Sequence, residues 1–307
     1  MTAPHQAEPS VTVVIPTRDR PQLVRRAIRS ALVQDYLGTV DVVVVYDGVE
    51  PEPGLLADFP ERVRVLVNRR TPGLAGARNT GILDSTAELI AFLDDDDWWR
   101  PTKLRLQVAA RAGAGRPALV TAAMTVDFDG RLSDRLAGTG RVGVGHLLRS
   151  RMAMLHSSSF LFDRGALFRL GLVDESAPGS QNEDWDLLLR VAKEGDIVHV
   201  DEPLVVVRWG RTSFFARRWD GRNASLGWML DRHPEIAADR VGRSRVYGQL
   251  AFGEAAQGHR AQALGHARTA LRSRPAQWRA WIAIPVAVYP PSSEWVMNVL
   301  HRHGRGV

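Results

Sequence analysis

Four short apolar segments lie in the first hundred residues, and they predict buried parallel strands. They are rich in valine, isoleucine and leucine and lack the polar alternation of a half-exposed strand. They span Val11–Ile15, Val40–Tyr46, Val63–Val67 and Leu89–Leu93. The segment Pro21–Gln34 has helical spacing, with apolar and arginine side chains on opposite faces and a proline at its start. Strands alternating with helices predict right-handed βαβ units in an open, mostly parallel, twisted sheet flanked by helices.

The pattern is mixed between residues 118 and 207. Strands are expected at Leu119–Val126, Ser159–Phe162 and Ile197–Val207, and a helix is expected at Asp184–Lys193. We expect this part to complete the sheet and to shape a second substrate site. The sequence therefore predicts a disordered N-terminus over residues 1–10 and an α/β domain over residues 11–213.

Beyond Phe214 the chain is rich in alanine and arginine and has helical periodicity. Val246–Gly258 and Arg260–Ser273 predict a helical hairpin joined at Gly258. One such hairpin is too short for a solenoid, which needs about three repeats. Residues 214–307 are therefore expected to form a helical appendage to the α/β domain.

The composition is that of a globular protein, with 307 residues of which 45% are hydrophobic. The absence of cysteine excludes disulfides, thiolate metal sites and a cysteine nucleophile. The first ten residues are polar and resemble no secretory signal, so a cytoplasmic location is expected. The apolar run Trp281–Tyr289 is shorter than the roughly 20 residues that span a bilayer, and Pro285 interrupts it.

The net charge of +6 is unevenly distributed. Residues 214–307 hold 14 basic and 6 acidic side chains, whereas residues 1–213 hold 26 and 28. A basic region indicates an anionic partner, and peripheral contact with an anionic membrane is one hypothesis. The alternative is a general arginine bias, since Lys103 and Lys193 are the only lysines. Nucleic-acid binding is not expected, because the region carries no recognisable motif.

Four consecutive aspartates, Asp94–Asp97, follow the fourth apolar segment. Their carboxylates repel one another unless a cation offsets the charge, and oxygen ligands suit Mg2+ or Mn2+ bound to a diphosphate. The alternative is a cap for a helix that starts near Pro101, but one aspartate would suffice for a cap. The cluster therefore favours a divalent metal site.

A second acidic group comprises Glu183 and Asp184 at the start of the expected helix. The helix dipole favours ionised carboxylates there, and an ionised carboxylate aimed at a hydroxyl can act as a general base. The alternative is the acidic N-terminus of an ordinary surface helix. The residues alone do not separate these two interpretations.

Five motifs in order resemble the family 2 glycosyltransferases of GT-A fold, over about residues 11–213. They are VVIPTRDR at 13–20, VVVYDG at 43–48, GLAGARNTGI at 73–82, FLDDDDWWRPTKL at 92–104 and EDWDLLLR at 183–190. The resemblance implies a Rossmann-like sheet, a nucleoside-diphosphate sugar donor, a carbohydrate or glycoconjugate acceptor, and Mn2+ or Mg2+. It also implies a single displacement that inverts the anomeric configuration.

The resemblance assigns roles to residues of this chain. Asp184, with Glu183 beside it, corresponds to the catalytic base. Asp96 and Asp94 correspond to the metal-binding pair, with Asp94 nearer the ribose. The donor side comprises Pro16, Thr17, Arg18, Asp19, Asp47, Gly73, Arg78, Asp94 and Asp95.

The sequence departs from the family pattern at two places. The resemblance implies a UDP-sugar donor. Tyr46 stands where many relatives have an acidic residue, so dTDP- and GDP-sugar donors stay open. The histidine that often follows the last strand is absent, and Arg208 or Arg211 is expected to contact the diphosphate instead. The alternative is that the two arginines are an ordinary surface pair. His156 and Trp185 are assigned to the acceptor side.

Two other functional classes fit the sequence less well than a glycosyltransferase does. A nucleotidyltransferase would carry a glycine-rich signature after the first strand, and residues 17–21 contain no glycine. An inactive sugar-nucleotide-binding relative would be expected to lose the metal carboxylates or the Glu-Asp pair, and both are present. The sequence therefore favours an active glycosyltransferase.

Overall fold

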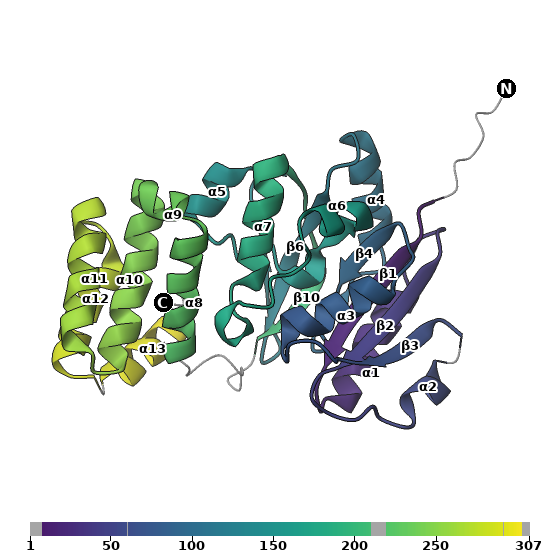
Figure 1. The fold of residues 1–307 in the computed structure, drawn as a ribbon, viewed down its shortest axis with the longest axis horizontal. Helices are drawn as coiled ribbons and strands as arrows, with labels where there is room; N and C mark the ends of the chain where they lie inside the picture. Colours follow the sequence, from purple (N-terminus) through teal and green to yellow (C-terminus); the bar gives the residue numbers. More distant parts are fainter. Residues whose placement is uncertain (1–7, 60, 210–218, 291, 303–307) are drawn as a thin grey trace. The chain divides into compact units, whose positions relative to one another are not determined.

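The computed structural model describes residues 8–59, 61–209, 219–290 and 292–302 (Figure 1). The chain forms two compact units, which we call the α/β unit and the helical unit. The α/β unit comprises residues up to 144, residues 152–175 and residues 183–213, and the remaining segments form the helical unit. The N-terminus predicted to be disordered lies outside the described residues up to residue 7.

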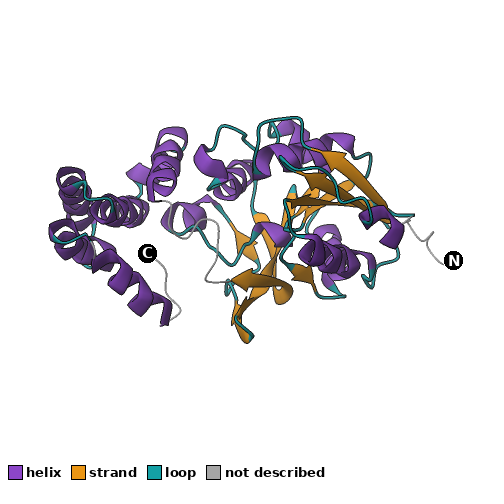
Figure 2. Cartoon of the chain, turned by 90° about the horizontal axis from the view of Figure 1, so that it is seen from below, coloured by secondary structure: helices purple, strands orange, loops and turns teal. Residues whose placement is uncertain are grey.

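A ten-stranded sheet forms the centre of the α/β unit (Figure 2). Eight strands lie in the order β3-β2-β1-β4-β9-β6-β10-β5, while β7 pairs with β6 and β8 with β10. The strands are β1 Val11–Thr17, β2 Val40–Tyr46, β3 Val63–Val67, β4 Leu89–Phe92, β5 Trp98–Trp99, β6 Leu119–Phe128, β7 Arg131–Arg135, β8 Arg141–Val142, β9 Leu161–Asp163 and β10 Ile197–Trp209.

The first four strands of the sheet order are parallel, as predicted. Beyond β4 the sheet is mixed, because β9 runs antiparallel to both β4 and β6, while β6 and β10 are parallel. The predicted parallel arrangement is therefore confirmed for β3, β2, β1 and β4 and recurs in the pair β6 and β10, with antiparallel strands between and beside them. Strands β6 and β7 are antiparallel because the short turn between them reverses the chain.

Helices cover both faces of the sheet. On one face α1 (Pro21–Leu32) and α4 (Lys103–Gly113) share a core with alternate residues of β1, including Val13 and Ile15. On the other face α3 (Leu74–Asp84) approaches Val14 through Gly81, where an added Cβ would lie 2.5 Å from the Val14 side chain. Adjacent residues of one strand thus face different helices, as a pleated strand requires.

The remaining helices of the α/β unit are shorter or lie later in the chain. They are α2 (Leu55–Asp58), the 3-10 turn η1 (Ser157–Ser159), α6 (Arg164–Arg169) and α7 (Glu183–Glu194). Helix α7 begins one residue before the expected Asp184. Its first turn holds Glu183, Asp184 and Asp186, where the helix dipole favours negative charge.

The helical unit confirms the predicted appendage. Its described helices after residue 218 are α8 (Trp219–Arg232), α9 (Glu235–Ala238), α10 (Arg240–Ala256), α11 (Arg260–Ser273), α12 (Trp278–Val288) and α13 (Ser292–Arg302). Two earlier segments also belong to this unit. Residues 145–151 contain all but the first residue of helix α5 (Val144–Arg149), and residues 176–182 contain the 3-10 turn η2 (Pro178–Ser180). The turn between α10 and α11 contains Gly258 with a φ of +83°, a conformation that favours glycine.

Alanines dominate the core of this helical unit, including Ala251, Ala263, Ala267 and Ala283, around the buried ring of Phe252. Small side chains let the helices approach closely. In the described part of the chain no helix is both long enough and apolar enough to cross a membrane.

Candidate functional site

The sequence motifs that follow neighbouring strands lie together at one edge of the sheet. Thr17 at the end of β1 lies in register with Tyr46 at the end of β2. The chain leaves β4 beside β1, where the Leu93 backbone N–H donates to the Val14 carbonyl. Asp47 and Asp94 therefore begin loops at the same carboxyl edge, where ligands bind in open α/β sheets.

Two of the four aspartates face the loop that follows β1. The Asp95 carboxylate accepts hydrogen bonds from Thr17 Oγ1 at 2.7 Å and from Arg20 Nη1 at 2.9 Å. The same Arg20 nitrogen lies 2.9 Å from Asp96 Oδ2. Arg20 thus neutralises part of the charge that Asp95 and Asp96 share.

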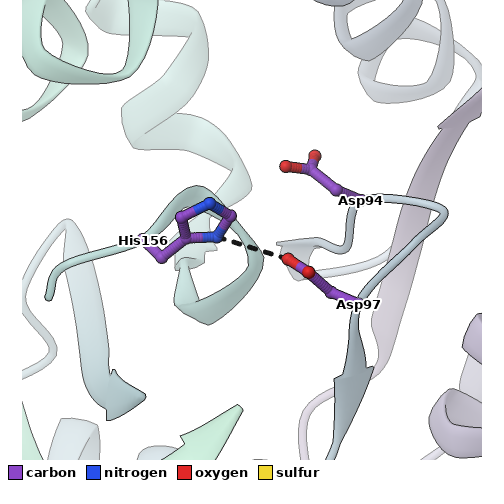
Figure 3. A group of neighbouring side chains, drawn as sticks. All are labelled: Asp94, Asp97 and His156. Atoms are coloured by element: carbon purple, nitrogen blue, oxygen red, sulfur yellow. Dashed lines mark ion pairs between the residues drawn. The ribbon is translucent and has the colours of Figure 1, made fainter. Parts of the chain in front are cut away.

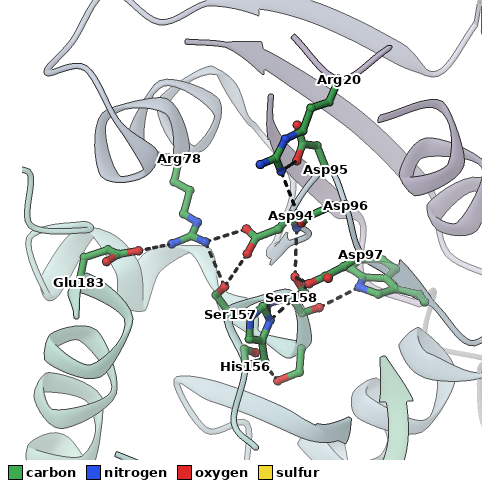
Figure 4. A network of polar contacts seen from close by, with 12 residues as sticks. Arg20, Arg78, Asp94, Asp95, Asp96, Asp97, His156, Ser157, Ser158 and Glu183 are labelled. Carbon is green, nitrogen blue, oxygen red and sulfur yellow. Dashed lines mark hydrogen bonds and ion pairs between the residues drawn. The ribbon is translucent and has the colours of Figure 1, made fainter. Parts of the chain in front are cut away.

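The other two aspartates face the opposite way (Figure 4). Asp94 accepts from Arg78 Nη2 at 2.8 Å and from Ser157 Oγ at 3.2 Å. Asp97 accepts from Ser158 Oγ at 2.6 Å and from the Arg208 backbone N–H at 3.0 Å. The turn η1 therefore supplies one hydroxyl to each of these aspartates.

Arg78 connects the two acidic groups. Its guanidinium is buried and donates from Nη1 to Glu183 Oε1 at 3.0 Å while Nη2 binds Asp94. Glycine at position 76 lets α3 approach the preceding loop, because an added Cβ there would lie 2.0 Å from the Thr71 carbonyl oxygen. The fork of one arginine thus joins carboxylates 89 positions apart in the sequence.

The carboxylates of the cluster have different acidities. Burial raises the pKa of Asp94, but the charges of Arg78 and His156 outweigh it, so the pKa is lowered overall. Burial, together with repulsion from Asp94 and Asp96, raises the pKa of Asp97 well above its ordinary value. The cluster therefore holds one strongly ionised carboxylate and one that gains stability from a proton or a cation.

A candidate metal centre lies between β4 and η1 (Figure 3). Asp94, Asp97 and His156 each offer one ligand atom, and these atoms lie within 4.8 Å of one another. His156 Nδ1 is 3.4 Å from Asp97 Oδ2. Two carboxylate oxygens and an imidazole nitrogen form a ligand set that suits Mn2+. For Mg2+ the carboxylate oxygens are the suitable ligands.

Asp96, which the sequence assigns to the metal, lies beside this group and contacts Arg20. Its side chain is 33% exposed and is the most accessible of the four aspartates, since Asp94 is 20% exposed and Asp95 and Asp97 are buried. Burial and repulsion from Asp94 and Asp95 raise the pKa of Asp96. Its carboxylate is therefore close to the candidate metal centre and accessible to a ligand.

The two residues assigned to the base differ in accessibility. Glu183 is buried against Arg78, whereas Asp184 is half-buried and accepts a hydrogen bond from the Trp185 backbone N–H at 2.8 Å. The Trp185 side chain is 1% exposed and packs in the interior. Of the residues assigned to the acceptor side, only His156 lies within the aspartate cluster.

The donor-side residues lie at the end of β1, in the loops after β1, β2, β3 and β4, and, for Arg78, on α3. The Asp47 carboxylate accepts from Asn68 Nδ2 at 2.7 Å and from the Gly73 backbone N–H at 2.9 Å, so it fixes the entry to α3. Arg18 is exposed on the loop after β1, where Asp19 has a φ of 51°. Arg208 is exposed beside Asp97, and Arg211 lies outside the described residues.

Comparison with known proteins identifies the family. The profile described as Glycosyl transferase family 2 matches residues 12–175, just over half of the chain. The chain belongs to glycosyl transferase family 2. The matched region of this family 2 chain contains both Arg78 and the four aspartates.

Curated relatives match part of the chain. The succinoglycan biosynthesis protein ExoO of Rhizobium meliloti is 40% identical over 125 residues, which cover 40% of this chain and 36% of ExoO. The Escherichia coli protein UDP-Glc:alpha-D-GlcNAc-diphosphoundecaprenol beta-1,3-glucosyltransferase WfgD is 31% identical over 100 residues, covering 32% of this chain and 40% of WfgD. The family 2 chain thus spans about two-fifths of the length of these relatives.

Solved structures share the fold. TarS of S. aureus, residues 1–349 in complex with UDP, superposes with a TM-score of 0.61 at 17% identity, covering 96% of this chain and 92% of that one. The mannosyltransferase PcManGT of Pyrobaculum calidifontis, in complex with GDP-Man and Mn2+, gives 0.56 at 18% identity, covering 96% and 86%. The family 2 chain therefore has the α/β fold with C-terminal helices that the sequence predicted.

Several side chains at the site were not assigned from the sequence of the family 2 chain. Arg20 bridges Asp95 and Asp96, and the hydroxyls of Ser157 and Ser158 bind Asp94 and Asp97. The serines precede β9, far along the chain from the aspartates. No local sequence pattern predicts that these serines contact the aspartates, although the run of three serines beside His156 indicates a polar turn.

Proposed function

We propose that this chain is a metal-dependent inverting glycosyltransferase that moves a sugar from a nucleoside-diphosphate sugar to an acceptor hydroxyl. The observation that carries the proposal is the buried Arg78 fork, which holds Asp94 and Glu183 in one site. It supports a single centre in which the expected metal carboxylate and the expected base act together.

The divalent cation, Mn2+ or Mg2+, is proposed to bind at the aspartate cluster. Asp94 is proposed as a ligand on both the family motif and the geometry. Asp96 is supported by the family motif, and Asp97 and His156 are supported by the closeness of their ligand atoms to Asp94. The bound cation would offset the charge that develops on the departing nucleoside diphosphate.

Asp184 is proposed as the general base. Glu183 is engaged by Arg78, whereas Asp184 is the more accessible carboxylate of the pair. Asp184 would accept the proton of the acceptor hydroxyl while the oxygen attacks the anomeric carbon and the bond to the diphosphate oxygen breaks. Attack from the face opposite the leaving group inverts the configuration, and no covalent nucleophile is needed.

The donor is proposed to be a UDP-sugar, with Asp47 and the loop after Thr17 beside the base and ribose. TarS was solved with UDP and with UDP-GlcNAc, which supports this choice, while PcManGT was solved with GDP-Man. Tyr46 is mostly buried at the end of β2 and packs in the core of the α/β unit, so its ring does not serve as a free stacking surface. Base recognition is therefore proposed to rest on Asp47 and its neighbouring backbone.

The acceptor is proposed to be a carbohydrate or glycoconjugate in polysaccharide biosynthesis. The name of ExoO refers to succinoglycan biosynthesis, and the name of WfgD refers to a diphosphoundecaprenol-linked sugar. Cytoplasmic location with peripheral contact to an anionic membrane is proposed for the chain, through its basic region after residue 213.

A donor screen tests the proposed function. The full chain is incubated with UDP-, GDP-, dTDP- and CDP-sugars, with and without Mn2+, and thermal shift and donor hydrolysis are measured. We expect a UDP-sugar to raise the Tm and to be hydrolysed slowly, both only with the cation. The variant Asp94→Asn should lose both effects, and Glu194→Gln, an exposed change near the end of α7, should keep them. Hydrolysis by Asp94→Asn at the wild-type rate would contradict the proposal.

A further inference from the structure

The helical unit exposes apolar side chains on two adjoining helices. On α12, Trp281, Ile284 and Val288 are spaced as one helical face, and Trp281 and Val288 are 55% and 64% exposed. On α11, Leu264 and Leu271 share a face. Ile284 lines a cleft of about 430 Å³ together with both leucines, so the two faces form one surface.

Arginines border this surface. Arg268 and Arg272 line the same cleft from α11, and both are exposed. The sequence between residues 255 and 293 contains five arginines and no acidic residue. We call the set Leu264, Arg268, Leu271, Arg272, Trp281, Ile284 and Val288 the apolar-basic surface.

The tryptophan of this surface is held in its exposed position. Trp281 Nε1 donates a hydrogen bond to the Pro275 carbonyl oxygen at 2.7 Å, which satisfies the indole nitrogen and leaves the ring face uncovered. A tryptophan with one polar edge and an apolar face suits the boundary between water and lipid. Arginine side chains can keep their charge at the headgroups while their apolar stems lie lower.

We propose that the apolar-basic surface docks on an anionic lipid bilayer. The apolar side chains enter the headgroup boundary, and Arg268 and Arg272 contact lipid phosphates. The charge of the whole segment is complementary to such a membrane, and no acidic side chain between residues 255 and 293 opposes it. The inference rests on the membrane contact in the proposed function and names the surface that makes it. It does not depend on the donor or on the metal, because it concerns residues of the helical unit alone.

Vesicle co-sedimentation of the full chain tests the inference. The vesicles contain either phosphatidylcholine alone or equal parts of phosphatidylcholine and phosphatidylglycerol, and each is measured at low and high salt. We expect binding to the anionic vesicles at low salt, and weaker binding at high salt because counterions screen the arginines. Vesicles of phosphatidylcholine alone should bind much less.

Variants separate the charged and the apolar parts. Arg268→Glu with Arg272→Glu should weaken binding at least about 25-fold, since each arginine near an anionic surface contributes about fivefold. Trp281→Ala should weaken binding at both salt concentrations. Arg62→Glu, an exposed change before β3, is the matched control and should bind as the wild type does. Thermal unfolding and donor binding in solution confirm that each variant is folded.

Three results would overturn the inference. The first is absence of binding to anionic vesicles at low salt, and the second is equal binding by the double glutamate variant. The third is a concentration-dependent dimer that Trp281→Ala dissociates in the absence of vesicle binding, which would assign the surface to a second copy of the chain. Each of these results would leave the donor screen unaffected.

Discussion

At the residue scale, Arg78 has the most demanding environment of the site. It is buried with its charge balanced by Asp94 and Glu183, and burial of an ion pair is tolerated only when such hydrogen bonds are made. Burial opposes the charge of Arg78, but the two carboxylates outweigh it and raise its pKa. The residue assigned from the sequence to the donor side thus also supports the carboxylates of the site.

Removal of this arginine should destabilise the fold. Arg78→Ala leaves the buried Glu183 carboxylate without its guanidinium, and breaking a buried pair costs about 3–5 kcal/mol. The free energy of unfolding in urea measures the effect, with Arg62→Ala as an exposed control. A loss below about 1 kcal/mol would show that the pair contributes no more than a surface ion pair does.

Cation binding should depend on pH through Asp97. The pKa of Asp97 is raised, so the carboxyl keeps its proton to a higher pH than in the unfolded chain, and Mn2+ has to displace that proton. Affinity for Mn2+ should therefore increase as the pH rises through this pKa, with protons released on binding. Calorimetry in buffers of different ionisation enthalpy measures the release.

Two variants assign the ligands. Asp97→Asn should abolish the proton release that Asp97 supplies. Asp96→Asn should reduce the release, because it removes part of the repulsion that raises the pKa of Asp97, and it should lower the affinity if Asp96 is a direct ligand. Wild-type binding without any proton release would contradict the account of Asp97. Unchanged affinity in Asp96→Asn would remove Asp96 from the metal site.

At the element scale, the parallel strands were the most predictable part. The predicted bounds of β2 and β3 match the structure, and those of β1 and β4 differ by one or two residues at the C-terminal end. Buried parallel strands are apolar along their whole length, so their signal is local. The sequence does not predict β5, β7 or β8, because these strands are too short or too polar to form an apolar run. Strands β5 and β8 pair with β10, which is distant in the sequence, and β7 pairs with β6 in a hairpin.

The contact between α3 and β1 should be sensitive to one methyl group. Gly81→Ala places a Cβ 2.5 Å from Val14 Cγ1, so the side chain or the helix has to move. Overpacking of this kind costs about 1–3 kcal/mol. Thermal and urea unfolding measure the loss.

Gly113→Ala is the matched control for this substitution. Gly113 ends α4 with no heavy atom within 4 Å of the added Cβ, so the change should be neutral or slightly stabilising. Equal stability of the Gly81 and Gly113 variants would show that α3 does not pack against β1 as described.

At the scale of the whole molecule, the sequence predicted the partners of the site but not how they meet. Strand-end positions bring Asp47 and Asp94 to one edge by topology alone. The link from Asp94 to Glu183 passes through a side chain of α3, and the contacts of Asp97 come from η1 and β10. Such contacts depend on how three separate elements pack together. Neither the hydrophobic periodicity nor the order of the motifs predicts that packing.

The central claim is that Asp184 acts as the base in a site organised by Arg78 and the aspartates. Asp184→Asn keeps the shape of the side chain and removes its ability to accept a proton. Steady-state transfer or donor hydrolysis, measured with donor binding on the same samples, tests the claim. We expect unchanged donor affinity and turnover lowered by about 100-fold or more, with Glu194→Gln unaffected. Turnover near that of the wild type, with donor still bound, would contradict the claim.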